Sequence, residues 1–149
     1  MNEFLMEDVD QHFREGLAQT MLVIHRNRLI GFLCLLTDSI DLDEEERVGF
    51  KSRGITYKSF PAVKIGRLGV DREYQHKGVG SLAVDYIVGL AFKARKYVGC
   101  RFLTVDAKND SRSITFWEGQ GFKKNLKENK ANRETISYRY DLLNPLPEK

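Results

Sequence analysis

The chain has few of the features that mark disulfide-rich, metal-binding and membrane proteins. Its 149 residues include two cysteines, Cys34 and Cys100, which lie in apolar runs without the spacing of a metal site. We therefore expect buried, reduced thiols and no metal centre. The acidic N-terminus lacks the basic segment and apolar stretch of a signal peptide, and the longest apolar run, around residues 29–36, is too short to span a bilayer. These absences predict a cytoplasmic protein with no membrane partner.

An excess of one charge sign is also missing. The formal net charge is +3, and 42% of the residues are hydrophobic and 30% charged, which is the composition of a globular protein. A charge this small neither requires nor excludes a nucleic-acid partner. Internal repeats and low-complexity segments are absent, so we predict a single domain over residues 1–149.

Apolar periodicity predicts alternating helices and strands. Helical spacing occurs at residues 3–17, 79–94 and 111–120, and strand-like runs occur at residues 21–25, 29–37, 63–70 and 101–105, from residue 122, and at 134–142. The acidic residues 41–46 are typical of a solvated loop or a helix start, and residues 47–60 of a loop. This order predicts an α/β fold (α+β mixed sheet) with helices on both faces of the sheet.

Residues 68–81 form the most informative segment, because a strand leads there through a glycine-containing loop into a long helix. Gly78 and Gly80 lack a Cβ atom, so the backbone can approach a ligand closely. The free N–H groups and the dipole of the helix start favour an anion, and His76 and Lys77 add donors. The segment predicts a diphosphate site, with an ordinary turn or helix cap as the alternative.

Two familiar phosphate motifs do not fit this segment. Ala83 stands where the dinucleotide-binding fingerprint needs its third glycine, and the acidic residue expected about 20 positions further on is missing. A Walker loop needs Gly-Lys-Ser or Gly-Lys-Thr, and the chain contains neither.

The pattern that does fit is Gln/Arg-x-x-Gly-x-Gly/Ala between a strand and a helix, which resembles the acetyl-CoA pyrophosphate loop of the GNAT N-acetyltransferase superfamily. Residues 65–71 resemble the family's strand before that loop, and residues 105–109 resemble the end of its next strand and the start of the helix that follows. Residues 114–122 are similar to its Phe-Tyr-x-x-x-Gly-Phe segment. The resemblance covers roughly residues 60–125. It implies a central, mostly antiparallel twisted sheet splayed at a β-bulge, preceded by a short N-terminal section.

The same resemblance implies an N-acetyltransferase that moves an acetyl group from acetyl-CoA to a primary amine by direct attack in a ternary complex. The backbone of Leu68, Gly69 and Val70 would bind the pantetheine arm. Asn109 would reach the cofactor or cap a helix, and Phe116 would wall the thioester channel. The residues implied to hold the diphosphate are Gln75, His76, Lys77, Gly78, Val79, Gly80 and Ser81.

One departure from the family pattern concerns the catalytic acid. Trp117 stands where many members have a tyrosine whose hydroxyl protonates the leaving thiolate. An indole N–H donates a hydrogen bond but does not release its proton usefully, so Trp117 also fits a core or channel-wall aromatic. The catalytic residues therefore stay unassigned, with Tyr74 as a substitute candidate and no carboxylate that stands out as a base.

The acceptor stays open between three functions. Residues 60–68 and 105–107 look most like the branch that contains tRNA-acetylating toxins, which would imply an aminoacyl-tRNA amine and a basic approach surface. The alternatives are an acetyltransferase for a small-molecule or peptide amine and a catalytically weak CoA-binding regulatory module. We also predict a homodimer contact through Phe4, Leu5 and Phe13. The cations that could supply the basic surface are Arg53, Lys58, Lys64, Arg67, Lys123, Lys124, Lys127 and Lys130.

Overall fold

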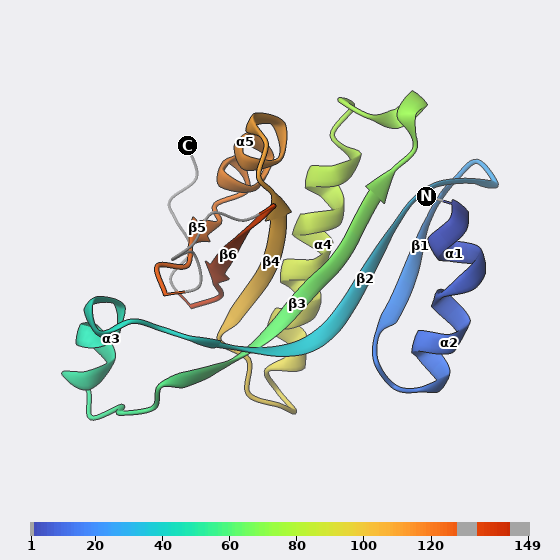
Figure 1. Ribbon diagram of the computed structural model, residues 1–149. Coiled ribbons are helices and arrows are strands. Elements are labelled where there is room, and N and C mark those ends of the chain that lie inside the picture. Colours follow the sequence, from blue (N-terminus) through green and yellow to red (C-terminus); the bar gives the residue numbers. More distant parts are fainter. Residues whose placement is uncertain (1, 128–133, 144–149) are drawn as a thin grey trace.

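A twisted mixed sheet with helices on both faces forms the centre of the molecule (Figure 1). The computed structural model describes residues 2–127 and 134–143. Its six strands follow the spatial order β1-β2-β3-β4-β6-β5, and only β3 and β4 run parallel to each other. The strands are β1 Gln19–His25, β2 Arg28–Asp41, β3 Ser59–Val70, β4 Phe102–Lys108, β5 Lys123–Lys124 and β6 Thr135–Asp141.

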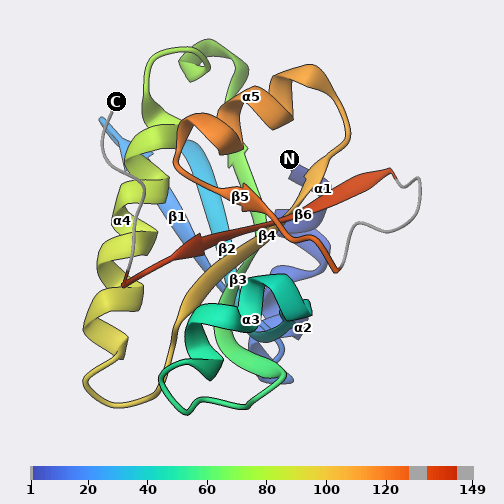
Figure 2. The same cartoon turned by 90° about the vertical axis from the view of Figure 1, so that its left-hand side faces the viewer.

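The helices divide between the two faces of this sheet. Figure 2 shows α4 on one side of the strands and α1 and α2 on the other. The helices are α1 Asn2–Glu7, α2 Val9–Arg14, α3 Glu44–Lys51, the 3-10 turn η1 Arg72–Tyr74, α4 Val79–Ala94 and α5 Ser111–Gly119. The predicted fold class is confirmed.

Alternating side chains of the strands supply a core to each face. Leu33 of β2 belongs to the main cluster, together with Ile87 of α4 and Trp117 of α5. Its neighbour Phe32 points to the opposite face, where it packs against Phe4 of α1. This period of two is what a sheet covered on both sides requires.

The sheet splays between β3 and β4, as predicted. Gly66 is the extra residue of a β-bulge, because Ile65 pairs with Leu35 and the next pair is Arg67 with Cys34. The parallel pairing of β3 with β4 covers only residues 62–65 and 102–105. Beyond these pairs the two strands diverge, and the described part of β3 after the bulge pairs only with β2.

Two predicted element boundaries were wrong. The helix expected over residues 3–17 is divided at Asp8 and ends at Arg14, after which Gly16 takes a φ of +68°. Residues 47–60 are not all loop, because α3 occupies Glu44–Lys51, and β2 and β3 continue pairing to Asp41 and Ser59.

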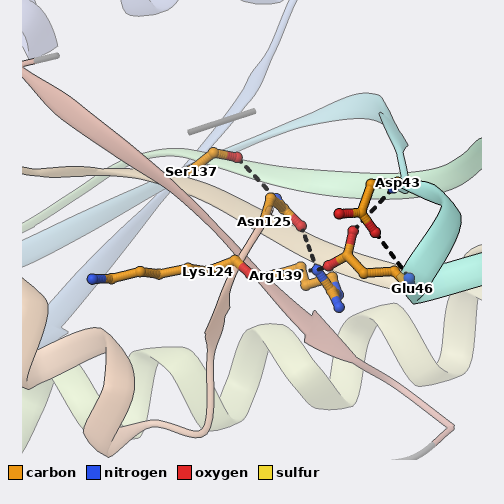
Figure 3. Close-up of polar contacts among 6 residues, drawn as sticks. All are labelled: Asp43, Glu46, Lys124, Asn125, Ser137 and Arg139. Carbon is orange, nitrogen blue, oxygen red and sulfur yellow. Dashed lines mark hydrogen bonds and ion pairs between the residues drawn. The ribbon is translucent and has the colours of Figure 1, made fainter. Parts of the chain in front are cut away.

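A polar network holds α3 against the sheet (Figure 3). Asp43 and Glu46 form a capping box, in which each side chain accepts a hydrogen bond from the other residue's backbone N–H. The Glu46 carboxylate also pairs with Arg139 of β6, whose guanidinium donates to Asn125 at 3.0 Å. The side chains of Glu46 and Arg139 are only 7% and 16% exposed, so the network ties α3 to β6 inside the protein.

Both cysteines are buried, as predicted. Burial raises the pKa of the Cys100 thiol, which keeps it protonated and unreactive. Among the described helices, none has the length and apolarity that crossing a membrane would need.

A buried tyrosine makes the stability of the fold sensitive to alkaline pH. The Tyr138 side chain on β6 is fully buried and donates a 3.1 Å hydrogen bond to Glu118 of α5. Burial and this carboxylate raise the pKa of Tyr138 to about 12, from 10 for an ordinary tyrosine. The unfolded chain would release this proton near its ordinary pKa, so the stabilising contribution is complete below about pH 10 and is lost as pH rises to about 12.

We therefore expect Tyr138→Phe to be less sensitive to alkali than the parent chain between about pH 10 and pH 12. Urea unfolding at a series of pH values would measure the difference. A variant that loses stability over this range as steeply as the parent would show that other groups control the alkaline limit.

Candidate active site

The open edge of β3 presents alternate peptide groups to the gap between β3 and β4. The backbone N–H of Asp71 donates to the carbonyl of Ile30 on β2 at 2.7 Å. Because peptide groups of a strand alternate in direction, those of Leu68 and Val70 point away from β2, whereas those of Gly69 point toward it. Of the three residues expected to bind an extended ligand, Leu68 therefore offers both backbone groups to the gap and Val70 offers its N–H. The Val70 carbonyl already accepts a hydrogen bond from the Gln75 side chain.

The loop after β3 has the backbone shape of an anion cradle. Asp71 accepts a 2.9 Å hydrogen bond from the N–H of Glu73 and so fixes the η1 turn. His76 and Gly78 then take positive φ angles of 61° and 84°, and α4 begins at Val79 without a side-chain cap. The N–H groups at the start of α4 are thereby left for a ligand or water.

Gln75 joins this loop to the open edge of β3. Its Nε2 donates to the carbonyl of Val70 at 2.9 Å, and its Oε1 accepts from Nη2 of Arg112 at 3.1 Å. The same Arg112 nitrogen lies 2.9 Å from Nε2 of His76. Gln75 was predicted as a diphosphate ligand, and its contacts in this structure are those of a residue that positions the loop.

One face of α5 forms the second wall of the cradle. Arg112, Phe116 and Gln120 are four residues apart and so lie on one face of the helix. Phe116 packs so closely on Gly80 that a Cβ atom there would lie 3.3 Å from its ring, and Gln120 donates to Oγ of Ser81 at 2.8 Å. Sequence reasoning found Phe116 but missed Arg112 and Gln120. Their spacing of four residues from Phe116 on a predicted helix could have indicated them.

Asn109 does not cap α5. Asp110 is the N-cap, because its carboxylate accepts a 2.8 Å hydrogen bond from the N–H of Ser113. This hydrogen bond lowers the pKa of Asp110. The alternative role considered for Asn109 was therefore wrong, and the exposed Asn109 follows the end of β4, where its backbone N–H donates to the carbonyl of Glu134.

The two aromatic residues considered for acid catalysis lie in different surroundings. Trp117 is buried in the main core, with its ring centroid 5.0 Å from those of Phe116 and Phe122. Tyr74 lies between the hairpin and the loop, with Arg28 and Lys77 over its ring.

The opposite face of the sheet carries a polar cluster at the point where β3 and β4 separate. Lys64 of β3 pairs with Asp106 of β4 at 2.7 Å, and Thr104 donates to Asp38 of β2 at 2.7 Å. The Asp106 side chain is 46% exposed. Sequence reasoning missed the carboxylates Asp38 and Asp106, because only the sheet brings them together.

Comparison with known proteins identifies the family of this fold. Residues 2–122 match the model of the acetyltransferase (GNAT) family. The chain belongs to the GNAT acetyltransferase family. The resemblance predicted from the loop motif is confirmed, and acetyl-CoA is the co-substrate of this GNAT domain.

Solved structures that the GNAT domain resembles include bacterial toxins. A tyrosine-to-phenylalanine mutant of AtaT is 23% identical, with a TM-score of 0.75 over 95% of this chain and 77% of that one. A tyrosine-to-phenylalanine mutant of KacT is 22% identical, with a TM-score of 0.76 over 95% of this chain and 81% of that one. AtaT complexed with acetyl-methionyl-tRNAfMet is 23% identical, with a TM-score of 0.75 over 94% and 80%. At these identities the likeness establishes the fold.

The site fits the shape and charge of acetyl-CoA. The peptide groups of Leu68 and the N–H of Val70 match an extended amide-containing arm. The positive φ at Gly78, with open space where a Cβ would lie, leaves the loop backbone accessible to phosphate oxygens. The N–H groups of α4 and the side chains of Lys77 and Arg112 supply positive charge at this place.

Proposed function

We propose that this GNAT domain transfers the acetyl group of acetyl-CoA to a primary amine by direct attack within a ternary complex. The observation that supports it most is the open β3 edge that leads directly into an anion cradle at the start of α4. Leu68 and the N–H of Val70 would hold the pantetheine arm, and residues 76–81 the diphosphate, with Gln75 positioning this loop. Holding two reactants in attack geometry supplies much of the rate enhancement such a reaction needs.

The amine would approach from the face opposite α4, where Lys64 and Asp106 lie. The exposed Asp106 carboxylate could bind an ammonium group or take up its proton. The leaving thiolate would depart without a tyrosine acid at position 117, because a thiolate is a tolerable leaving group. Asn109 and Phe116 keep the cofactor-side roles expected of them, as part of this proposal.

A calorimetric titration tests the proposal first. Acetyl-CoA should bind with a Kd of about 1–100 μM, and dephospho-CoA and free CoA measured beside it would report how far the 3′-phosphate and the acetyl group contribute. A panel of small and peptide amines would then show turnover as release of free thiol. Absence of acetyl-CoA binding would overturn the proposal.

Arg112 gives the proposal a residue-level prediction. If its guanidinium contacts a cofactor phosphate, Arg112→Ala should raise the Kd of acetyl-CoA at least about tenfold, because a charge-assisted hydrogen bond contributes about 1.5–3 kcal/mol. Acetyl-pantetheine lacks the diphosphate and should bind parent and variant alike. Arg14→Ala, on the opposite face, is the matched control. An equal loss with both ligands would mean that Arg112 only shapes the loop.

A substitution of Trp117 tests whether position 117 takes part in catalysis. We expect Trp117→Tyr to leave kcat within about threefold of the parent value and to lower stability by about 1–3 kcal/mol, because a hydroxyl would enter the apolar core beside Phe122. Steady-state kinetics and urea unfolding would measure both. A tenfold or larger gain in kcat would show instead that position 117 reaches the thioester.

A second candidate function is acetylation of aminoacyl-tRNA. The likeness to AtaT complexed with acetyl-methionyl-tRNAfMet favours it. Of the cations proposed for a basic surface, Lys64 and Lys127 are paired with carboxylates and Arg67 stacks on Phe4, whereas Lys130 lies outside the described residues. The remaining exposed cations are Arg53, Lys58, Lys123 and Lys124. Expression should then arrest translation, and Gly80→Glu should relieve the arrest.

The third candidate, a catalytically weak CoA-binding module, would bind acetyl-CoA without turnover on any acceptor. Turnover above background with one amine would remove it.

The homodimer stays a prediction, but the residues that would form its contact differ from those expected. Phe4 is buried and Leu5 half-buried within the chain, so the exposed Phe13, Leu22 and Ile24 would have to supply the contact.

A further inference from the structure

A cavity lies away from the proposed acetyl-CoA site. Its volume is about 260 Å³, and it is an open pocket lined by α3 and the segment after it, the start of β4, and the β5–β6 pair. Phe102 lines it near the start of β4, whereas the proposed cofactor site lies beyond Val105, where the pairing of β3 with β4 stops. The cavity is on the face of α3, so it shares no wall with α4.

Four cationic side chains surround this cavity. Arg101 is held by a bidentate pair with Asp141, at 2.8 Å for both contacts. Arg139 is held by Glu46 from α3 (Figure 3). These two ion pairs do not use Nη1 of Arg101 or Nη2 of Arg139. Carboxylates that orient a guanidinium in this way pre-organise its remaining donors.

The arginines are also fixed by aromatic rings. The Arg101 guanidinium lies 4.8 Å from the ring centroid of Phe50, and that of Arg53 lies 5.1 Å from the same ring. A guanidinium stacked on a ring keeps its N–H groups directed along its edge. Arg53 and Lys123 complete the cationic lining without a carboxylate partner among the described residues.

The charges of the lining leave an excess of two positive charges, because Arg53, Arg101, Lys123 and Arg139 face only the carboxylates Glu46 and Asp141. A phosphate monoester carries about −1.5 to −2 charges at pH 7 and accepts several hydrogen bonds. The cavity is smaller than the about 300–1,000 Å³ of typical ligand sites, which suits a compact ligand. We infer that this α3 pocket binds a small organic phosphate monoester.

Strand alternation provides a matched pair of variants. Lys123 lies opposite Arg139 and Lys124 opposite Tyr138 in the β5–β6 pairing. Directly opposed residues share a face, so Lys123 faces the pocket, and Figure 3 shows the Lys124 side chain pointing away from Glu46 and Arg139. Lys123→Ala removes a pocket cation, and Lys124→Ala removes the same charge from the other face.

The test is a titration of the full chain with glycerol phosphate in the presence of saturating acetyl-CoA, so that the cofactor cleft is closed to the probe. We expect one site with a Kd below about 1 mM, at least tenfold weaker binding in Arg53→Ala/Lys123→Ala, and unchanged binding in Lys124→Ala. The tetrahedral monoanion methyl sulfate should bind at least tenfold more weakly than glycerol phosphate.

Absence of saturable binding, an equal effect of Lys124→Ala, or equal binding of methyl sulfate would overturn the inference. It does not rest on acetyl transfer. If acetyl-CoA fails to bind, the same titration on the free chain still decides the pocket.

Discussion

Gly80→Glu is expected to raise the Kd of acetyl-CoA at least about a hundredfold, a loss of about 2.7 kcal/mol. Two effects combine. A Cβ at position 80 would lie 3.3 Å from the Phe116 ring, so the new side chain displaces one wall of the cradle. Its carboxylate would also stand at the helix start where we place the diphosphate, and like charges repel there. Calorimetry on the folded variant measures the loss.

Gly89→Glu is the matched control for this change. Gly89 is on the same helix and is exposed, and a Cβ atom added there would meet nothing within 4 Å. It should keep acetyl-CoA binding within about twofold of the parent value. Equal affinity in both variants would show that residues 75–81 are only a turn, and the proposed site would be wrong.

Arg139→Met is expected to lower the free energy of unfolding by about 3–5 kcal/mol. The substitution leaves the Glu46 carboxylate, only 7% exposed, without its cation, and it removes the donor to Asn125. A buried charge that loses its partner is costly because water cannot replace that partner. The loss is a large part of the about 5–15 kcal/mol that stabilises a typical domain. Urea unfolding gives the value.

Two further variants test whether the loss in Arg139→Met comes from leaving the Glu46 carboxylate unpaired. Glu46→Gln combined with Arg139→Met removes both charges and should recover part of the loss, because no buried charge is left unpaired. Arg14→Met breaks an exposed pair with Asp10, with side chains 74% and 71% exposed, and should change stability by no more than about 1 kcal/mol. A loss below about 1 kcal/mol in Arg139→Met would mean that water reaches Glu46.

The sequence predictions were accurate where the signal lies within a few neighbouring residues, and wrong where it depends on distant segments. The loop at residues 75–80 was located because glycine positions and the helical period after Val79 act over a few neighbouring residues. The boundaries around α3 were wrong because the pairing of Ile40 with Phe60 depends on two segments 20 residues apart. The helix start that was one of the two interpretations of the acidic residues 41–46 is confirmed, with Asp43 as the N-cap in a capping box with Glu46.

The sequence by itself determined the GNAT family, the mixed sheet with its splay, and the position of the glycine-containing loop before α4, where we propose the diphosphate binds. The mixed sheet and the loop follow from periodicity and backbone chemistry, which each segment carries alone, whereas the family and the splay followed from the resemblance of three short motifs. Only the tertiary structure decided that Trp117 is a core residue, that Arg112 meets Gln75 and His76, and that Arg101 and Arg139 share a pocket with Arg53. Each of these depends on the packing of elements distant in the chain, which no local pattern encodes.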